Sequence, residues 1–539
     1  MPRNKTARPL QQEVLGCGRS VFRIVIHVGD ARCQGDPEEE TSPLSPSLRS
    51  LHRRWKRLSV SAAMLFLFGI ACLFTGNLIA TGQQGIALLM AMAVPIAVVV
   101  LSSRIAPFYV IAIALFSLNS LSGWGMLPQQ VTWVIDFVIL LAVGKALFLW
   151  QRGEAGLPPT SLNLVVLGLA VVGAISVIVN GVAMPVVAAG VRHHFKYILM
   201  LYALCALKPD PSALRRLIWL LIGLAFLQTP VAVAQRVLLG IDDLVAGTLG
   251  YNANQELSLF LIGVACVLVG LFLQRYKMQG KLYLMTMPLL LAPIALNQAK
   301  AAFLYLPVAL GAVVVMGKRR RSWRALGLVL FLTAMVAALL FTADRVITRL
   351  QISEFLTDTD AMLGEFVETG DQGHSLIGYS KNGTFLRGSA VVYAHSEIVR
   401  SPVTALIGVG PGNASESFFG GSSGEYWDNR EPDKIQLSKT LFEFGYLGLL
   451  LFLVLHFLCF GEVLRMRFDD SFWRGVAIGF AGILVMYVLG ILYAPVWASD
   501  VLGFLFWFTA GALFLVGARR NSTGRHKVYA TIRGGSEKP

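Results

Sequence analysis

Charged residues are scarce in this chain of 539 residues, which limits the classes of protein it can belong to. Asp, Glu, Lys and Arg together make up 14% of the chain, whereas soluble proteins contain about 25%. With so few charges and 55% apolar residues, the folded chain cannot present a surface that water solvates throughout. A soluble enzyme and a disordered chain are therefore excluded. The six cysteines show neither metal-ligand spacing nor paired spacing, which excludes a secreted disulfide scaffold.

Long apolar runs recur from residue 58 to residue 517. Runs of this length can cross a hydrocarbon core of about 30 Å as helices. They predict an all-α, polytopic membrane protein with about 14 transmembrane helices in a lipid bilayer. We expect spans at 58–78, 84–103, 106–121, 131–150, 162–182, 195–208, 216–236, 256–274, 282–297, 301–317, 326–343, 438–460, 475–493 and 497–517.

Basic residues concentrate in the connectors on one side of these spans, as the positive-inside rule requires of cytoplasmic loops. Connectors on the other side, such as 79–83, 122–130 and 494–496, contain no Lys or Arg. Both termini are therefore predicted to be cytoplasmic. The basic residues of the cytoplasmic connectors also account for the net charge of +15. We therefore expect no nucleic-acid partner.

The charge pattern divides the chain into five segments. They are a flexible cytoplasmic tail at 1–57, transmembrane helices one to eleven at 58–343, a large extracytoplasmic loop at 344–437, helices twelve to fourteen at 438–517 and a basic cytoplasmic tail at 518–539.

Cations on the outer side run against this charge pattern, and ionisable groups at membrane depth are costly. The large loop is acidic, with 13 acidic and 7 basic residues over 344–436, so its cations are also unusual. Convergence on an anionic ligand explains such cations. Pairing with neighbouring acids and snorkelling to lipid headgroups are the alternatives. The candidate binding residues are Arg192, His193, His194, Lys196, Arg236, Lys300 and Lys434.

Four motifs resemble the O-antigen ligase/polymerase superfamily, and they occur in the family's order over residues 245–460. The first is Gly408-Val409-Gly410-Pro411-Gly412-Asn413, which is similar to the end of the family's "PLLGVGPGN" signature. The first Pro of that signature corresponds to Pro402. The family has an Arg about fifteen residues before this Pro, which corresponds to Arg387. The second, similar to the family's "ExGxxG", is Leu441-Phe442-Glu443-Phe444-Gly445-Tyr446-Leu447-Gly448. The third, similar to "GTxGNPN", is Gly247-Thr248-Leu249-Gly250-Tyr251-Asn252-Ala253-Asn254. The fourth is Lys300, which lies where a Ser-Arg pair is common in the family.

The resemblance implies transfer of a glycan from undecaprenyl pyrophosphate to an acceptor hydroxyl at the periplasmic face of the bacterial inner membrane. The family's ligase branch often has His-Asn nine residues before the Glu of "ExGxxG", where this chain has Lys434-Ile435. This departure favours a polymerase that joins repeat units into an O-antigen, capsule or exopolysaccharide. A flippase and a chain-length regulator of the same pathway are the implied protein partners.

Such a transfer must stabilise the negative charge of the departing pyrophosphate, which fixed Arg and Lys side chains can do without a metal or cofactor. We expect Arg387 to have this role and to converge with Arg192 and Lys300. A base for the acceptor hydroxyl could be His193, His194, His395 or Glu443. His395 is preferred, because on a helix it would lie about 80° around the axis from Arg387, near enough to border the same cavity.

Three alternatives remain at this point. A ligase would transfer the glycan to lipid A-core. A lipid-linked oligosaccharide flippase or another transporter could also have about 14 spans, although such proteins usually show internal repeats and short loops, and no repeat is found here. A non-enzymatic assembly subunit that only binds polysaccharide would have no need of outward cations at membrane depth.

Overall fold

The computed structural model describes residues 84–534, apart from 241–244, 251–252, 275, 277–279, 298, 300, 318–326, 328–330, 332–333, 335–337, 339–384, 416–423 and 428–430. The chain forms two compact units, residues 1–67 and 68–539, and all described residues belong to the second. Predicted spans 58–78 and most of 326–343, together with the tail at 1–57, lie outside the described residues.

Helices form the described part of the chain, which contains no β-strand. The α-helices are α2 (Gln84–Ser102), α3 (Ala106–Gly123), α4 (Val134–Gln151), α5 (Thr160–Asn180), α6 (Met184–Leu207), α7 (Pro211–Leu239), α8 (Asn254–Leu273), α9 (Gly280–Leu296), α10 (Ala302–Gly317), α14 (Arg387–Ile398), α15 (Pro402–Ile407), α16 (Gln436–Arg465), α17 (Ser471–Gly490) and α18 (Asp500–Gly534). Two 3₁₀ helices, η1 (Gln129–Trp133) and η3 (Gly247–Leu249), precede α4 and α8.

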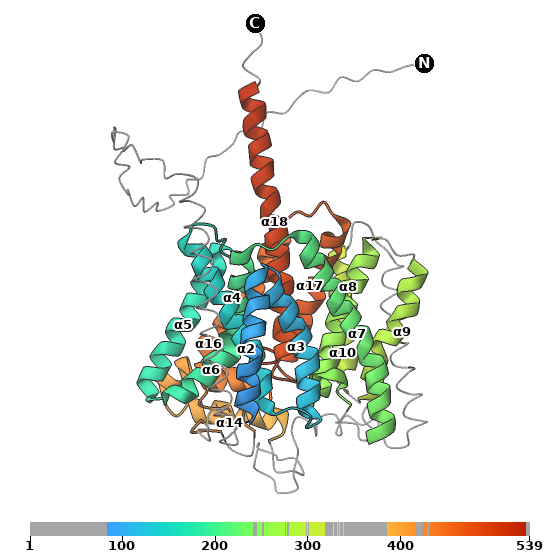
Figure 1. Ribbon diagram of the computed structural model, residues 1–539. Coiled ribbons are helices and arrows are strands. Elements are labelled where there is room, and N and C mark those ends of the chain that lie inside the picture. The colour runs from blue at the N-terminus through green and yellow to red at the C-terminus, as the bar shows by residue number, and fades with distance from the viewer. Residues whose placement is uncertain are drawn as a thin grey trace, which may run out of the picture. The chain divides into compact units, whose positions relative to one another are not determined.

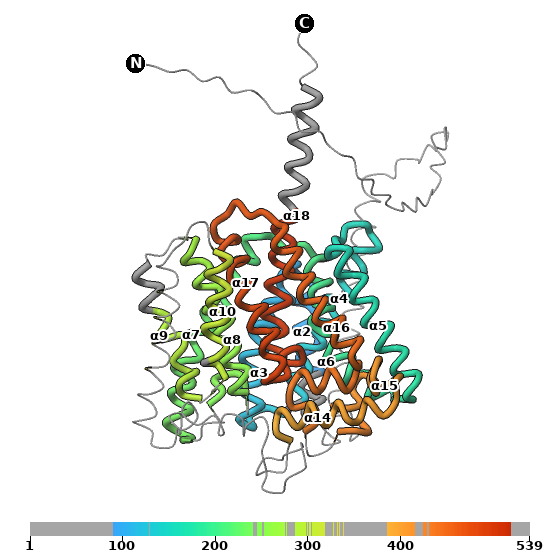
Figure 2. Tube along the Cα trace, turned by 180° about the vertical axis from the view of Figure 1, so that it is seen from behind, coloured from blue at the N-terminus to red at the C-terminus, as the bar shows by residue number. Residues whose placement is uncertain are grey.

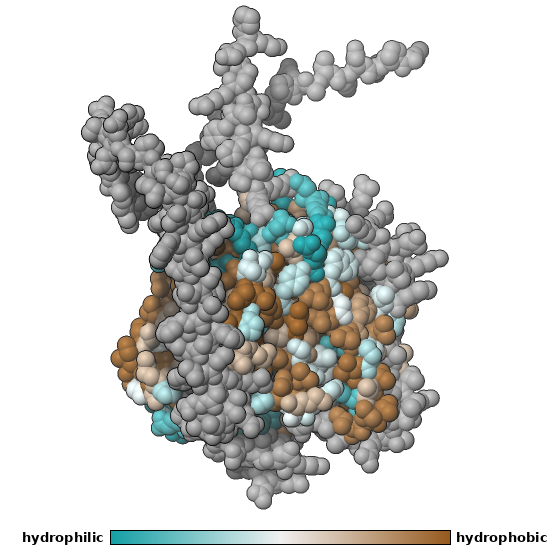
Figure 3. Space-filling view, in the orientation of Figure 1, coloured by the Kyte–Doolittle hydropathy of each residue, from teal (hydrophilic) through white to brown (hydrophobic). Residues whose placement is uncertain are grey.

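Eight described helices are long and apolar enough to cross a membrane: α3, η1 with α4, α5, α7, α8, α16, α17 and α18 up to Ala518. Several expose large apolar side chains; Leu140, Leu164 and Ile178 are 64%, 67% and 79% exposed. Hydrophobic side chains also cover much of the visible side of the bundle in Figure 3. Apolar surface of this extent is unfavourable in water and is suited to lipid, so the chain is a helical membrane protein.

Every predicted span from 84–103 to 301–317, and from 438–460 to 497–517, overlaps one of the described α-helices, although α2, α6, α9 and α10 are not among the eight. The two largest differences in the helix boundaries are in α6 and α18. Helix α6 begins at Met184 and not at residue 195, because Arg192, His194 and Lys196 pair with acids of other helices and so do not interrupt it. Helix α18 continues to Gly534, so most of the predicted tail 518–539 is helical.

Helices α8 and α17 form the most closely packed pair in the core, with α10 beside both (Figure 1). A Cβ atom on Gly270 would lie 2.2 Å from the carbonyl oxygen of Gly475, and one on Gly479 would lie 2.6 Å from Cα of Val267. Only glycine permits these backbones to touch. These contacts fix the C-terminal half of α8 against α17; the first turn of α8 carries part of the site described below.

Part of the predicted loop 344–437 folds onto the bundle. Helices α14 and α15 pack against α16, and in Figure 2 both lie at one end of the bundle, called here the α14 end. The Ser401 side chain accepts a hydrogen bond from Val403 N and Pro402 occupies the first turn of α15, a combination that favours helix initiation. The α14 end is also where the segments between α3 and α4, before α8 and before α18 meet.

Candidate functional site

Two glycine-rich motifs that are more than 30 residues apart in sequence pack directly on each other. Gly445 has φ 65° and ψ −167°, which breaks α16 two residues after Glu443. The freed carbonyl groups of Phe442 and Glu443 accept hydrogen bonds from Val409 N (2.9 Å) and Gly410 N (3.1 Å). The turn at 408–412 therefore replaces the hydrogen bonds that the kink removes from the helix.

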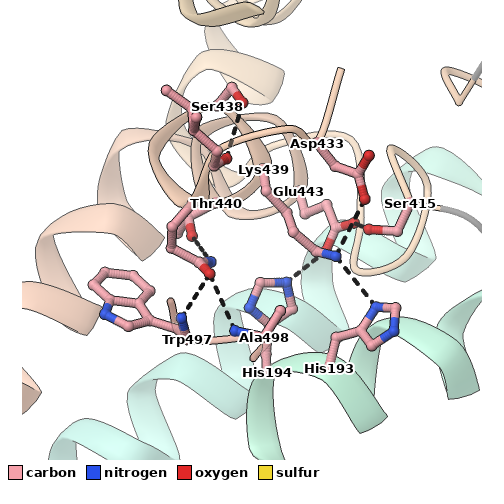
Figure 4. Close-up of polar contacts among 12 residues, drawn as sticks. His193, His194, Ser415, Asp433, Ser438, Lys439, Thr440, Glu443, Trp497 and Ala498 are labelled. Carbon is pink, nitrogen blue, oxygen red and sulfur yellow. Dashed lines mark hydrogen bonds and ion pairs between the residues drawn. The ribbon is translucent and has the colours of Figure 1, made fainter. Parts of the chain in front are cut away.

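This kink places the Glu443 carboxylate between two other elements. Its Oε2 pairs with His194 Nε2 at 2.6 Å, and its Oε1 accepts a hydrogen bond from Ser415 Oγ at 2.5 Å. The side chains of Glu443 and His194 have no exposure to solvent. Figure 4 shows Glu443 held between α6 and the segment that follows the 408–412 turn. The contact thus joins α6, α16 and that turn.

A second set of contacts lies beside the first (Figure 4). Lys439 Nζ lies 3.3 Å from His193 Nδ1 and 3.4 Å from Asp433 Oδ2. Burial raises the pKa of Asp433, and the charge of Lys439 opposes that rise. Because Lys439 can only donate, His193 Nδ1 is its acceptor and the proton of the neutral ring resides on Nε2.

The remaining cations of α6 pair with acids on α4 and α18. Arg192 Nε lies 2.8 Å from Asp136 Oδ2. Lys196 Nζ lies 3.1 Å from Asp136 Oδ1 and 2.5 Å from Asp500 Oδ1. Three helices are therefore joined by a chain of opposite charges, in which removing one partner would leave another charge unpaired where water is scarce.

Arg387, the first residue of α14, is buried, and it is oriented by the connection between α17 and α18. Its Nε donates to the Tyr493 carbonyl at 3.2 Å, and its guanidinium lies 4.4 Å from the centre of the Tyr493 ring. With the Gln255 amide oriented to satisfy both neighbours, its oxygen accepts from Arg387 Nη2 at 2.8 Å and its nitrogen donates to Tyr493 O at 3.2 Å. Arg387 is therefore bonded to the first turn of α8.

The α17–α18 connection is fixed by Gln436 at the start of α16. Gln436 N donates to the Ala494 carbonyl at 3.1 Å, and its side-chain oxygen accepts from Trp497 N and Ala498 N at 2.9 and 3.2 Å. Figure 4 shows the Trp497 and Ala498 contacts. The next residue, Ser499, donates from Oγ to Glu256 Oε2 at 2.6 Å. One connection thus positions the partners of both Arg387 and Glu256.

A polar cavity of about 540 Å³ opens at the α14 end between α3, α6, α8 and α18. Its lining carries hydroxyl, amide, carboxylate and cationic groups, a set that can form hydrogen bonds with a highly hydroxylated ligand. The polar lining includes Asn119, Ser122, Arg192, His193, Glu256 and Asp500.

An apolar groove of about 720 Å³ lies next to this cavity, between the end of α3 and the last turns of α7. Trp124, Leu227 and Leu238 are among its lining residues. Gly123 and Gly250 line both the groove and the polar cavity. A polar space and an apolar space therefore adjoin at the surface of a membrane protein.

The other residues predicted for the site have different surroundings. His395 is exposed and its Nδ1 pairs with the Tyr446 hydroxyl at 2.5 Å, so its partners differ from those of Arg387. Lys434 pairs with Glu431 at 3.7 Å, and its pKa is lowered by burial and further by the charge of Arg387. Arg236 lies in the last turn of α7. Lys300 lies outside the described residues.

Apart from Glu443, sequence reasoning missed the acids of this site. Asp136, Glu256 and Asp500 fall within or beside predicted apolar spans, so the cost of ionisable groups at membrane depth would have identified them as it identified the cations. Lys439 lies in predicted span 438–460 and carried the same signal, whereas Asp433 lies outside every predicted span and carried none. Within the described residues, no three His, Cys, Asp or Glu side chains come together as metal ligands.

No protein-family model and no curated protein matches this chain.

Proposed function

We propose that the chain is a polymerase that joins undecaprenyl-pyrophosphate-linked oligosaccharide repeat units into a cell-surface polysaccharide at the periplasmic face of the bacterial inner membrane. The observation that carries the proposal is that the polar cavity and the apolar groove adjoin through Gly123 and Gly250. A ligand with a long apolar chain and a hydrophilic head fits two such spaces, whereas a water-soluble sugar nucleotide would leave the groove empty.

The polar cavity suits the sugar part of this substrate. Asn119, Ser122, Glu256 and Asp500 offer amide, hydroxyl and carboxylate groups, which match the many donors and acceptors of a sugar ring. The charges of Arg192 and Asp500 are already paired with Asp136 and Lys196. The lining is therefore of mixed charge, which suits a neutral or weakly charged glycan.

Arg387 and Lys434 supply the positive charge that a departing pyrophosphate requires. The two cations lie close enough for Arg387 to lower the pKa of Lys434, so an anion bound between them would relieve their repulsion. The planar guanidinium of Arg387 can also hold phosphate oxygens with two parallel hydrogen bonds. Lys300 is proposed as a third cation of this group.

In the proposed reaction, a hydroxyl oxygen of the acceptor glycan attacks the anomeric carbon of the donor repeat unit. The new glycosidic C–O bond forms as the bond from that carbon to the pyrophosphate oxygen breaks. The bonding electron pair leaves on the pyrophosphate, and the hydroxyl proton passes to a base. We propose the flippase and the chain-length regulator of the same pathway as partners that supply the substrate and limit the product.

Reconstitution of the purified protein into lipid vesicles tests this function. The donor is the lipid-linked repeat unit extracted from host cells that lack this chain. We expect glycans of two or more repeats, with one polyprenyl pyrophosphate released for each bond formed. Vesicles without the protein are the control, and failure to lengthen the glycan on either face of the vesicle would contradict the proposal.

The same experiment separates the alternatives. A ligase would release polyprenyl pyrophosphate only when lipid A-core is added, and its product would be linked to that acceptor. A flippase would move the lipid-linked unit across the vesicle without forming a glycosidic bond. A binding subunit would do neither.

A further inference from the structure

We infer that Glu256 is the general base that removes the proton from the acceptor hydroxyl, an inference that rests on the proposed function. Glu256 lies in the first turn of α8 and lines the polar cavity. Its Oε2 accepts from Ser499 Oγ at 2.6 Å. Oε1 is thus left to accept a hydrogen bond from a ligand in the cavity.

The pairing of the cavity's carboxylates distinguishes Glu256 from the others. Asp500 also lines the cavity, but its Oδ1 lies 2.5 Å from Lys196 Nζ. Asp136 is shared between Arg192 and Lys196. Among the described residues, no cation pairs with Glu256.

The histidines of this region do not meet the same requirements. His193 lines the cavity, but Nδ1 accepts from Lys439, and the neutral ring then carries its proton on Nε2 and can only donate there. His194 is fully buried against Glu443. His395 is exposed and bonded to Tyr446. None of the three histidines combines access to the cavity with an available acceptor atom, as Glu256 does.

The position of Glu256 next to Gln255 gives the inference a geometric basis. Adjacent residues of an α-helix project about 100° apart. Gln255 binds Arg387, the proposed partner of the leaving group, while Glu256 faces the cavity. The first turn of α8 therefore holds both the leaving-group cation and the base. In the reaction, the hydroxyl proton moves to Oε1 of Glu256 as the oxygen bonds to the anomeric carbon, and the electron pair of the broken bond departs with pyrophosphate.

The competing explanation is that Glu256 only ties α8 to the α17–α18 connection through Ser499. A pair of substitutions separates the two roles. Glu256→Gln keeps a side-chain oxygen that can accept from Ser499 but removes the base. Ser499→Ala removes the hydrogen bond but keeps the base. Glu256→Asp keeps a carboxylate that is one methylene shorter.

The test is the rate of pyrophosphate release by these variants in vesicles, with the extracted lipid-linked repeat unit as the probe. We expect Glu256→Gln to lower kcat by about 10²–10⁴ with KM little changed. Ser499→Ala should remain within about tenfold of the unchanged protein, and Glu256→Asp should retain more activity than the Gln variant. The rate of the unchanged protein should fall at low pH, and the residual rate of the Gln variant should not follow that fall.

Two results would overturn the assignment of Glu256. One is a Gln variant as active as the unchanged protein. The other is an equal loss in the Gln and Ala variants, which would make Glu256 a positioning residue. In both cases the unchanged protein still polymerises, so the proposed function stands. An unchanged protein that forms no glycosidic bond would remove the function and the base together.

Discussion

The contact between Glu443 and His194 is the most enclosed polar interaction among the motif residues, because neither side chain is exposed. Such a contact need not add to stability when it is intact, but removing one partner leaves a buried polar group unpaired, at a cost of about 3–5 kcal/mol. Glu443 thus holds α16 against α6, and its part in the "ExGxxG" resemblance has a structural explanation. A role in proton transfer would require a path from the cavity to its enclosed carboxylate.

We predict that Glu443→Ala and His194→Ala each lower the free energy of unfolding by about 3–5 kcal/mol. The double variant should lose less than the sum of the two, since the residues contact each other. Thermal unfolding of the protein in detergent measures this. His395→Ala is the matched control, because His395 is exposed and should change stability little. Additive losses would show that the pair is not coupled.

Arg387 makes contacts that a lysine cannot reproduce. Its guanidinium bonds the Tyr493 carbonyl and Gln255 while lying against the Tyr493 ring. We predict that Arg387→Lys lowers the rate of polymerisation by about 10²–10³, the usual effect of losing one pre-organised donor to a developing anion. Polymer length on a gel, from cells making lipid-linked repeat units, is the readout. Arg400→Lys is the control, because Arg400 is exposed and pairs with Glu397. Long polymer from the Lys variant at normal protein levels would remove Arg387 from the mechanism.

At the scale of elements, the kink in α16 depends on one glycine. The dihedral angles of Gly445 are in a region that essentially only glycine occupies, and a Cβ atom there would lie 2.6 Å from the carbonyl carbon of Leu406 and from Gly408 N. A straight α16 would need neither the 408–412 turn nor the enclosed position of Glu443. The spacing of the two glycine motifs thus encodes a packing contact.

We predict that Gly445→Ala destabilises the protein by at least about 1–3 kcal/mol, because the backbone strain adds to the steric clash. Gly461→Ala in the same helix is the matched control. A Cβ atom at Gly461 would meet nothing within 4 Å, so alanine there should be neutral or stabilising by about 0.5–1 kcal/mol. Thermal unfolding of both variants in detergent checks the difference. Equal melting temperatures would mean that the kink is not needed for folding.

The elements that could be predicted from sequence were those whose signal is local. Apolar runs located most helices because burial in lipid requires length and hydrophobicity alone. Helix α6 was predicted to begin too late, because residues 190–196 look polar until Asp136, Asp500 and Glu443 from other helices are seen to pair with them. Pairing of this kind joins residues that are 56 to more than 200 positions apart, and no local pattern records it.

At the scale of the whole molecule, the charge pattern predicted which connectors share a side, and the structure brings several of them together. The segments next to Gly123, Glu256 and Asp500, all expected on the outer side, line one cavity. The candidate site could be located in this way as a region. The chemistry of the site could not be predicted in this way. The basic residues of α6 were predicted to face an anionic ligand, but Arg192, His194 and Lys196 contact Asp136, Glu443 and Asp500.

The last prediction concerns the side of the membrane on which the α14 end lies. Basic connectors lie on the side of the termini, and the positive-inside rule makes that side cytoplasmic, so α14 should be outside the cytoplasm. Ser396 on α14 and Arg467 between α16 and α17 are both exposed and lie on opposite sides in the predicted topology. In a chain whose own cysteines are replaced by serine, a membrane-impermeant maleimide applied to spheroplasts should label Ser396→Cys. It should label Arg467→Cys only after lysis. The opposite pattern would invert the topology, and the proposed donor, which is presented at the outer leaflet, could then not reach the polar cavity.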